Sequence, residues 1–369
     1  MSKRRGQETE NQRRSGKRLQ CRKHLYLVLD DWDKGFTIHK IDADSFDSDY
    51  HDDTEPASDG VAVAGHLTEP PAIRLQEPGE DACMFFTALD NKIFIVTDQC
   101  HGQTPALMYD TETTGLAFGP RVPAHLQCGF NVVVAAGEAL YAFSSPRYNK
   151  QKSFQVMSWK PTALDHYNPR YPSEGALPWR SLSGPPPPFD RYEIITSYAA
   201  HPEGHTIFMT TSYSDRPNVQ KSSYSFNTKN CAWKWHAWVL PFKGPGYFDC
   251  DLDAWVGLHK DEYICSCRVA TDSGSATPIN LGLVQLDYKI LKNKLFLKDR
   301  ERHVRASLTY MGRSKFCLVE TVIHKVGVND EDFHLSAHDG CVLHMTIFVL
   351  KRGRPEMSST SHAVSTGAG

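Results

Sequence analysis

The chain has 369 residues, of which 40% are hydrophobic and 11% aromatic, and its formal net charge at pH 7 is −2. This is enough apolar material for a large core, and the balanced charge gives no general reason to expect binding to nucleic acid or to an anionic membrane. No apolar run is long enough to span a membrane, and the charged N-terminus lacks the apolar segment of a secretory signal. We therefore expect a protein of the nucleus or cytoplasm that is not secreted, with its 10 cysteines as free thiols.

Residues 1–22 are basic and show no hydrophobic periodicity, so we expect a disordered arm. Two basic clusters separated by a polar spacer resemble a bipartite nuclear-import signal, which makes an importin an expected partner of the arm. The alternative is a solvated tail that no receptor reads. Nucleic-acid binding is less favoured, because no helix or aromatic platform accompanies the charges. The basic residues concerned are Lys3, Arg4, Arg5, Arg13, Arg14, Lys17 and Arg18.

From residue 24 onward, β-strand patterns follow one another and helical periodicity is almost absent. Residues 24–29 and 36–41 predict a β-hairpin. Residues 42–60 predict an acidic loop without regular structure. At the other end of the chain, residues 352–369 are rich in Ser, Thr and Gly and predict a disordered tail.

Between these ends, a unit of strands and turns recurs about every 40–55 residues, which predicts one all-β domain over residues 23–351. The expected fold is a β-propeller of about six four-stranded blades. We also expect strand 342–350 to complete the blade that strand 24–29 opens, because such pairing removes an unpaired edge. The repeated units are expected at residues 83–123, 131–188 and 192–244, with two more beginning at residues 247 and 306.

Four tryptophans gather in the second half of the chain: Trp233, Trp235, Trp238 and Trp255. Large rings in such strands predict packing between neighbouring sheets. The alternative is an aromatic binding rim on one face of the propeller. Trp233 and Trp235 can share one face of a strand, since side chains alternate with a period of two.

No catalytic motif stands out, since the chain has no Gly-x-Ser-x-Gly elbow and no glycine-rich phosphate loop. Cys265 and Cys267 are too close for a usual zinc pair, and alternation places both on one strand face, which favours packing. His334 and His338 have helical spacing without a helix, and the acidic stretch 42–59 lacks the glycine and glutamate of a calcium loop. We expect no catalytic residue, cofactor or metal site.

Segments at residues 24–32, 240–244, 247–258 and 296–320, together with the Met-Ser-Lys-Arg-Arg opening, resemble a known family. It is a plant family, expanded in cereals, of uncharacterised proteins described as kelch-like. The resemblance implies a plant origin and a propeller-like fold, and it brings no activity to carry over. The chain departs from true kelch repeats, because it lacks the Gly-Gly doublet at the strand ends.

The expected function is a non-catalytic protein-interaction scaffold with an unknown protein partner. One alternative is a substrate-recognition adaptor for a ubiquitin ligase. Such an adaptor would act without its own F-box, since the residues before the first strand are too few for one. Another alternative is a propeller-based oxidase or carbohydrate-binding protein. An oxidase would need Tyr, Cys and His side chains clustered in the propeller channel.

Overall fold

The computed structural model describes the chain in segments, and every element of regular structure in them is a β-strand. The all-β prediction is therefore confirmed for the described part of the chain. In that part, no helix has the length and apolar character needed to cross a membrane. The described residues are 24–30, 35–42, 63–65, 70–76, 84–97, 106–120, 132–144, 153–158, 179–182, 187–189, 192–213, 215–268, 284–291, 303–324, 340–351 and 360–366.

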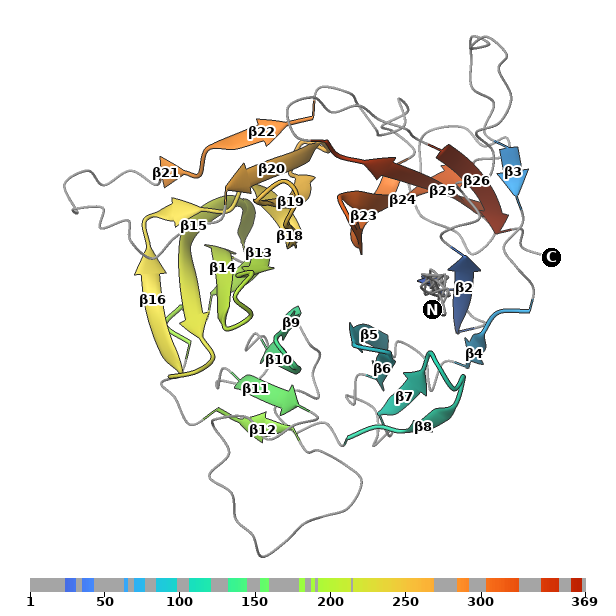
Figure 1. Ribbon diagram of the computed structural model, residues 1–369, viewed down its shortest axis with the longest axis horizontal. Helices are drawn as coiled ribbons and strands as arrows, with labels where there is room; N and C mark the ends of the chain where they lie inside the picture. Colours follow the sequence, from blue (N-terminus) through green and yellow to red (C-terminus); the bar gives the residue numbers. More distant parts are fainter. Residues whose placement is uncertain are drawn as a thin grey trace, which may run out of the picture.

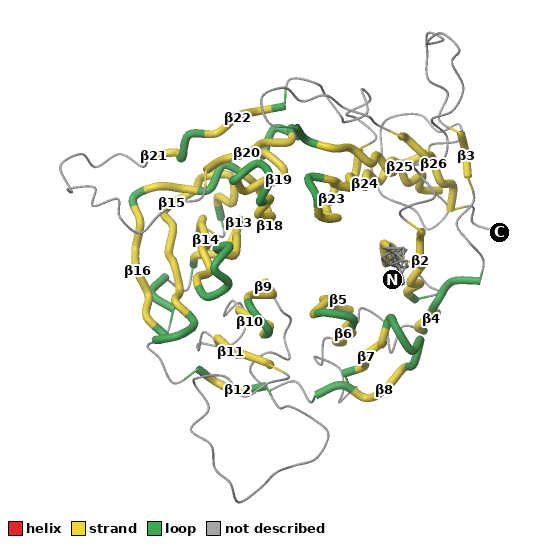
Figure 2. The backbone as a smooth tube through the Cα atoms, in the orientation of Figure 1, coloured by secondary structure: helices red, strands yellow, loops and turns green. Residues whose placement is uncertain are grey.

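The sheets stand around a common axis, which gives a propeller-like fold (Figure 1). In the sheets of β5–β8 and β9–β12, the first strand lies nearest the axis and the last strand lies toward the periphery (Figure 2). The first three sheets are antiparallel and follow the chain order. They are β1-β2-β4 (His24–Asp30, Phe36–Asp42, Ile73–Leu75), β5-β6-β7-β8 (Met84–Leu89, Lys92–Thr97, Leu107–Asp110, Leu116–Phe118) and β9-β10-β11-β12 (Val132–Ala136, Ala139–Ser144, Ser153–Ser158, Arg180–Ser181).

The next sheet has eight strands, because parallel pairing of β13 with β18 joins two four-stranded units edge to edge. The unit that we expected to begin at residue 247 therefore begins earlier, at Phe242. The first unit comprises β13, β14, β15 and β16 (Glu193–Ala200, Thr206–Tyr213, Arg216–Asn227, Ala232–His236). The second comprises β18, β19, β20 and β22 (Phe242–Asp249, Ala254–His259, Ile264–Arg268, Tyr288–Ile290), while β17 (Trp238–Val239) and β21 (Val284–Gln285) form a separate parallel pair.

The two ends of the chain meet differently from our expectation. The last large sheet consists of β23 (His303–Gly312), β24 (Lys315–His324), β25 (Gly340–Val349), β26 (Thr360–Thr366) and β3 (Val63–Gly65). The prediction that strand 342–350 completes the sheet of strand 24–29 is wrong, since β25 pairs with β24 and β26, and β1 pairs with β2. The predicted disordered tail is likewise wrong over residues 360–366, because β26 pairs with β25 and runs parallel to β3.

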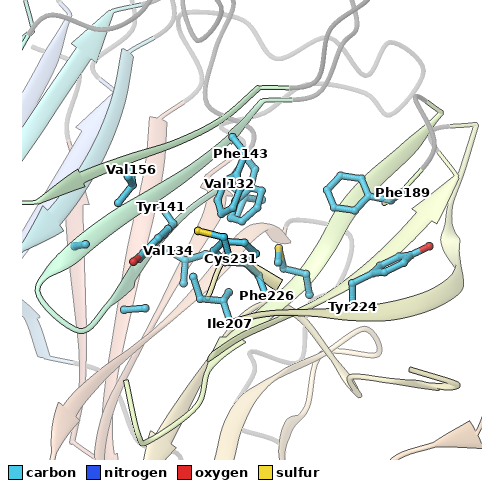
Figure 3. Close-up of a cluster of buried hydrophobic side chains, with 14 residues drawn as sticks. Val132, Val134, Tyr141, Phe143, Val156, Phe189, Ile207, Tyr224, Phe226 and Cys231 are labelled. Carbon is cyan, nitrogen blue, oxygen red and sulfur yellow. The ribbon is translucent and has the colours of Figure 1, made fainter. Parts of the chain in front are cut away.

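Several inner strands, such as β6 and β10, are buried on both faces and read accordingly as apolar runs, while outer strands such as β8 and β16 are largely exposed. In β10, for example, Leu140 and Ala142 point to one neighbouring sheet, while Tyr141 and Phe143 point to the other. Figure 3 shows the second of these clusters, where the sheet of β9–β12 packs on the sheet of β13–β16. Comparable clusters of described residues lie between each sheet or unit and the next around the ring, and the sheet of β1 packs on that of β24 and β25.

A turn with the same hydrogen bonds recurs between the third and fourth strands of two units. Asp110 and Asn227 each end a strand and accept backbone N–H groups two and three residues later through their side-chain oxygen. The next residue is a threonine in both. The backbone N–H of Thr111 donates to the carbonyl oxygen of Asn91 at 2.8 Å, and that of Thr228 donates to the carbonyl oxygen of His205 at 2.8 Å. The Asp/Asn-Thr pair therefore ties the outer hairpin of a sheet to its inner one.

We expect Thr228→Val to lower the free energy of unfolding by about 1 kcal/mol, because it removes one hydrogen bond of this tie. The Thr228 hydroxyl donates to the carbonyl oxygen of His205 at 3.2 Å, and valine fills similar space without the donor. Thr228→Ser keeps the hydroxyl and serves as the control. Urea denaturation monitored by tryptophan fluorescence measures the difference, and equal midpoints for the valine variant and the wild type would contradict the role of the hydroxyl.

Candidate functional site

A cavity of about 350 Å³ lies where inner strands of several sheets approach the axis. The residues that line it come from strands that are distant in sequence. Phe85 and Thr87 come from β5, Val133 from β9, Tyr198 from β13 and Arg305 from β23. These strands surround the centre of the ring in Figure 1. The axial cavity, as we call it, therefore exists only once the ring of sheets has assembled.

Most of the described residues that line the axial cavity are apolar, although polar atoms make up the larger part of its exposed surface. Packed core supports this wall from behind. Trp179, directly before β12, lines the cavity and is only 8% exposed. It belongs to the cluster in which Leu140 and Met157 are fully buried, and Phe85 and Val133 pack against the same cluster. Because these side chains are held by neighbours in two sheets, the wall keeps its shape without a ligand.

Three polar side chains complete the lining: Thr87, Tyr198 and Arg305. Within the described residues, none of the three has a hydrogen bond or ion pair from its side chain. Burial raises the pKa of Tyr198, so its phenol stays protonated at neutral pH and can donate a hydrogen bond. Arg305 is exposed and is the only charged residue among the described residues of the lining.

The lining offers binding groups rather than acid–base groups. Among the described residues that form it, there is no Asp, Glu, His or Cys side chain. Elsewhere in the described ranges, no three or more of these residues gather in a way that could hold a metal ion. The described part of the arrangement can thus hold an apolar group with an acceptor or a negative charge at one end.

Two of the four tryptophans lie in the core between β14 and β19. Trp255 is fully buried, and its indole N–H donates to the carbonyl oxygen of Ala200 at 3.0 Å. Trp238 is half-buried beside Phe208, with the ring centroids 5.5 Å apart. The prediction of packing between sheets is confirmed for Trp255, and a binding rim that includes this residue is excluded by its burial.

The other two tryptophans lie on one face of β16, as alternation predicts, but in different surroundings. Trp233 packs against the cluster of Figure 3, next to Phe226 and Phe154. Trp235 is 57% exposed. The structure therefore distributes the four tryptophans over two packing clusters and the surface, and it does not bring them together as one patch.

The two close cysteines are core residues, as expected. Cys265 and Cys267 of β20 are both buried in the cluster that contains Trp255, and burial raises the pKa of each thiol to about 12. The other predicted features, including the basic arm 1–22, the acidic loop beyond Asp42 and the pair His334 and His338, lie outside the described residues.

A buried histidine should make stability depend on pH. His259 ends β19, stacks on Tyr288 with ring centroids 5.3 Å apart, and accepts the backbone N–H of Asp261 at Nδ1. Burial lowers its pKa below the usual 6.5, a shift that Lys260 reinforces and Asp261 opposes. As the pH falls below about 6.5, the unfolded chain binds this proton first, so we expect the folded state to lose stability there.

The measurement is the melting temperature at about pH 7.5 and about pH 5, in the wild type and in His259→Phe, which keeps the stacked ring but does not titrate. We expect a smaller loss of melting temperature on acidification in the variant. If both proteins lose the same amount, His259 does not contribute to the acid sensitivity.

None of the residues of the axial cavity was singled out in the sequence. The sequence around Arg305 contains one signal of a polar strand face. Arg305 alternates with Ser307 and Thr309, which are polar, and the residues between them, Ala306 and Leu308, face a core. Tyr198 gave none, because a tyrosine inside the apolar strand β13 looks like any other core residue. The spatial meeting of these residues depends on sheets that are far apart in the chain.

Comparison with known proteins places this chain in a family. No curated protein matches the sequence. Similar solved structures include the periplasmic gluconolactonase PpgL of Pseudomonas aeruginosa, with a TM-score of 0.43 and 12% identity over 94% of this chain and 96% of that one. Others are AztD of Citrobacter koseri (TM-score 0.31, 9% identity, 94% and 99% covered) and the WD40 domain of SCAP from fission yeast (TM-score 0.31, 9% identity, 80% and 70% covered).

The scores of these structures are low, so no activity or ligand is taken from them. The family match is much more extensive, because a family model aligns with nearly the whole ring of sheets. The matched residues are 22–365, and the chain thus belongs to the family described as Protein of unknown function (DUF1668).

Proposed function

We propose that this chain is a six-bladed, kelch-like propeller of plant origin that serves as a non-catalytic protein-interaction scaffold. A partner would bind at the axial cavity. The observation that carries this proposal is the lining of that cavity, which combines a rigid apolar wall with Thr87, Tyr198 and Arg305 as donors. The blade count rests on the hydrophobic clusters that lie between successive units all round the ring.

Binding is favoured over catalysis by the chemistry of the side chains available. A general base that works near neutral pH is usually a histidine or a carboxylate of shifted pKa, and the described residues of the lining include neither. An oxidase site of Tyr, Cys and His would need sulfur or imidazole beside Tyr198, and the part of the lining that the structure describes offers neither group. The buried cysteines Cys265 and Cys267 belong to the packing between two other units.

The test is proximity labelling with mass spectrometry, which compares the intact chain with a variant in which the cavity is filled. Thr87→Phe places a ring in the cavity at a strand position that tolerates aromatic residues. Ala88→Phe is the matched control, because Ala88 is exposed on the same strand and does not line the cavity. We expect a reproducible partner set that Ala88→Phe keeps and Thr87→Phe loses.

Retention of the same partners by Thr87→Phe would reject the axial cavity as the binding site. Circular dichroism and melting temperatures of both variants show whether each one still folds. A version of the chain that begins at Lys23 tests whether the propeller alone holds the partners.

We also propose that the basic arm directs the protein to the nucleus through an importin, with the cytoplasm as the location when the arm is not read. Replacing Arg13, Arg14, Lys17 and Arg18 with alanine removes four positive charges from the second cluster. A fluorescent fusion of this variant is expected to lose nuclear enrichment. Unchanged enrichment would reject the arm as an import signal.

A further inference from the structure

We propose that the axial cavity recognises an apolar group that carries a carboxylate, with Arg305 as the partner of the negative charge. The location of this site rests on the proposed function, and the inference adds the chemistry of what binds there. It concerns a binding group only and includes no covalent step.

The charge of the lining favours an anion. Arg305 is the one charged side chain among the described residues that line the cavity, and no ion pair with another described residue neutralises it. Its planar guanidinium presents parallel N–H donors that match the two oxygens of a carboxylate. A ligand ammonium group would be repelled at this place, and a neutral amide would gain less from the same donors.

The other polar groups of the lining can serve the same carboxylate. Tyr198 comes from β13 and Thr87 from β5, so the hydroxyls and the guanidinium approach from three different sheets. A carboxylate accepts up to about four hydrogen bonds on its two oxygens, more than the two parallel bonds of a bidentate contact with Arg305. Because the phenol of Tyr198 remains protonated, it can act as a donor beside the guanidinium.

The apolar residues of the lining indicate what the ligand carries besides its carboxylate. Phe85, Val133 and Trp179 offer aromatic and aliphatic surface, and the cavity of about 350 Å³ lies near the lower end of the range for ligand sites, about 300–1,000 Å³. This space suits one aromatic or branched aliphatic group. A carboxylate attached to such an apolar group could come from either of two sources, a small free acid or the C-terminal residue of a partner protein.

The experiment measures binding of matched acids and amides to the intact protein by calorimetry and ligand-observed NMR. The probes are N-acetyl-phenylalanine and its amide, phenylacetate and phenylacetamide, and a hexapeptide ending in phenylalanine with a free or an amidated C-terminus. We expect each acid to bind about tenfold more tightly than its amide, the size expected for hydrogen bonds to a charged group. Because Arg305 is exposed, this preference should shrink at about 1 M salt, where charges are screened beyond about 3 Å.

Variants at Arg305 test whether this residue reads the charge. Arg305→Gln should abolish the preference for acids and leave the affinity for the amides nearly unchanged, while Arg305→Lys should keep part of the preference. Lys243→Gln is the matched control, since Lys243 is an exposed cation on the inner strand β18 outside the cavity lining, and it should bind like the wild type. Whichever binds with higher affinity, the small acids or the peptide with a free C-terminus, identifies the source of the carboxylate.

Equal binding of acids and amides, an acid preference that survives Arg305→Gln, or no binding of any probe would overturn the inference. These failures differ from a failure of the proposed function. If the probes show no preference while Thr87→Phe still loses its partners, only the carboxylate inference is wrong. If acids bind as expected while Thr87→Phe keeps every partner, the cavity is a small-acid site and the scaffold proposal is wrong.

Discussion

Replacing Asp249 with alanine is expected to lower the free energy of unfolding by about 3 kcal/mol, one of the larger effects available in this fold. Asp249 is fully buried at the end of β18, where its carboxylate accepts the Ser314 backbone N–H at 2.8 Å and the Ser314 hydroxyl at 2.9 Å. It also accepts the backbone N–H of Leu252 at 2.9 Å, and the hydroxyl of Tyr310 donates to it as well. The alanine variant would leave these donors buried without an acceptor.

This carboxylate joins the hairpin turns of two neighbouring units. Ser314 lies in the β23–β24 turn, where Arg313 and Ser314 have φ angles of 53° and 56°, so Asp249 also stabilises a left-handed backbone. Asp251→Ala is the control, because Asp251 is exposed and meets Ser314 at 3.5 Å only. Urea denaturation of both variants decides the matter, and an equal loss of stability in the two would show that Asp249 does not act as a buried anchor.

The second large effect is expected at Gly257, where alanine should cost about 2 kcal/mol or more. A Cβ atom at Gly257 would lie 2.7 Å from Cγ and 2.8 Å from Cβ of Phe242, the base of a side chain that cannot swing away. A Cβ atom at Gly246, which lies on β18 together with Phe242, would also overlap the Phe242 ring. Phe242 is 1% exposed, so its ring fills the space that the missing side chains of two paired strands leave open.

A double-mutant cycle shows whether the ring causes the loss. Phe242→Leu alone should destabilise, but combined with Gly257→Ala it should cost less than the sum of the two single changes, because the smaller side chain relieves the overlap. Gly119→Ala is the matched control. A Cβ there meets its nearest heavy atoms at the ordinary distance of 3.4 Å, so the change is expected to be neutral or stabilising by up to about 1 kcal/mol. Strictly additive losses in the cycle would contradict the close packing of Gly257 on Phe242.

Local patterns predicted much of the fold, because they report which residues of a strand face which side. Alternation along 264–268 correctly predicted the shared, packed face of Cys265 and Cys267. The Asp-Thr and Asn-Thr pairs lie in turns, since their short side chains satisfy nearby backbone groups whatever surrounds them. These interactions lie within a few residues of one another and can be read from a single segment.

The errors concern pairing between distant segments. Hydrophobicity identified 342–350 as a strand, but its partners β24 and β26 depend on how the whole ring closes. Residues 360–366 are small and polar, so nothing in their composition predicts a strand, and the backbone hydrogen bonds of β25 and β3 decide their structure. A strand of this composition is determined by the backbone groups on either side of it more than by its own side chains.

The candidate site shows the same division. The sequence by itself determined that this chain is all-β and repeats units of strands and turns, because apolar strand patterns and turn residues are local properties. Only the tertiary structure decided that Thr87, Tyr198 and Arg305 line one cavity, because each lies on a different sheet and they meet across the axis of the ring. It also decided that Trp255 packs inside and Trp235 stays exposed, since burial depends on which neighbouring sheet covers each face.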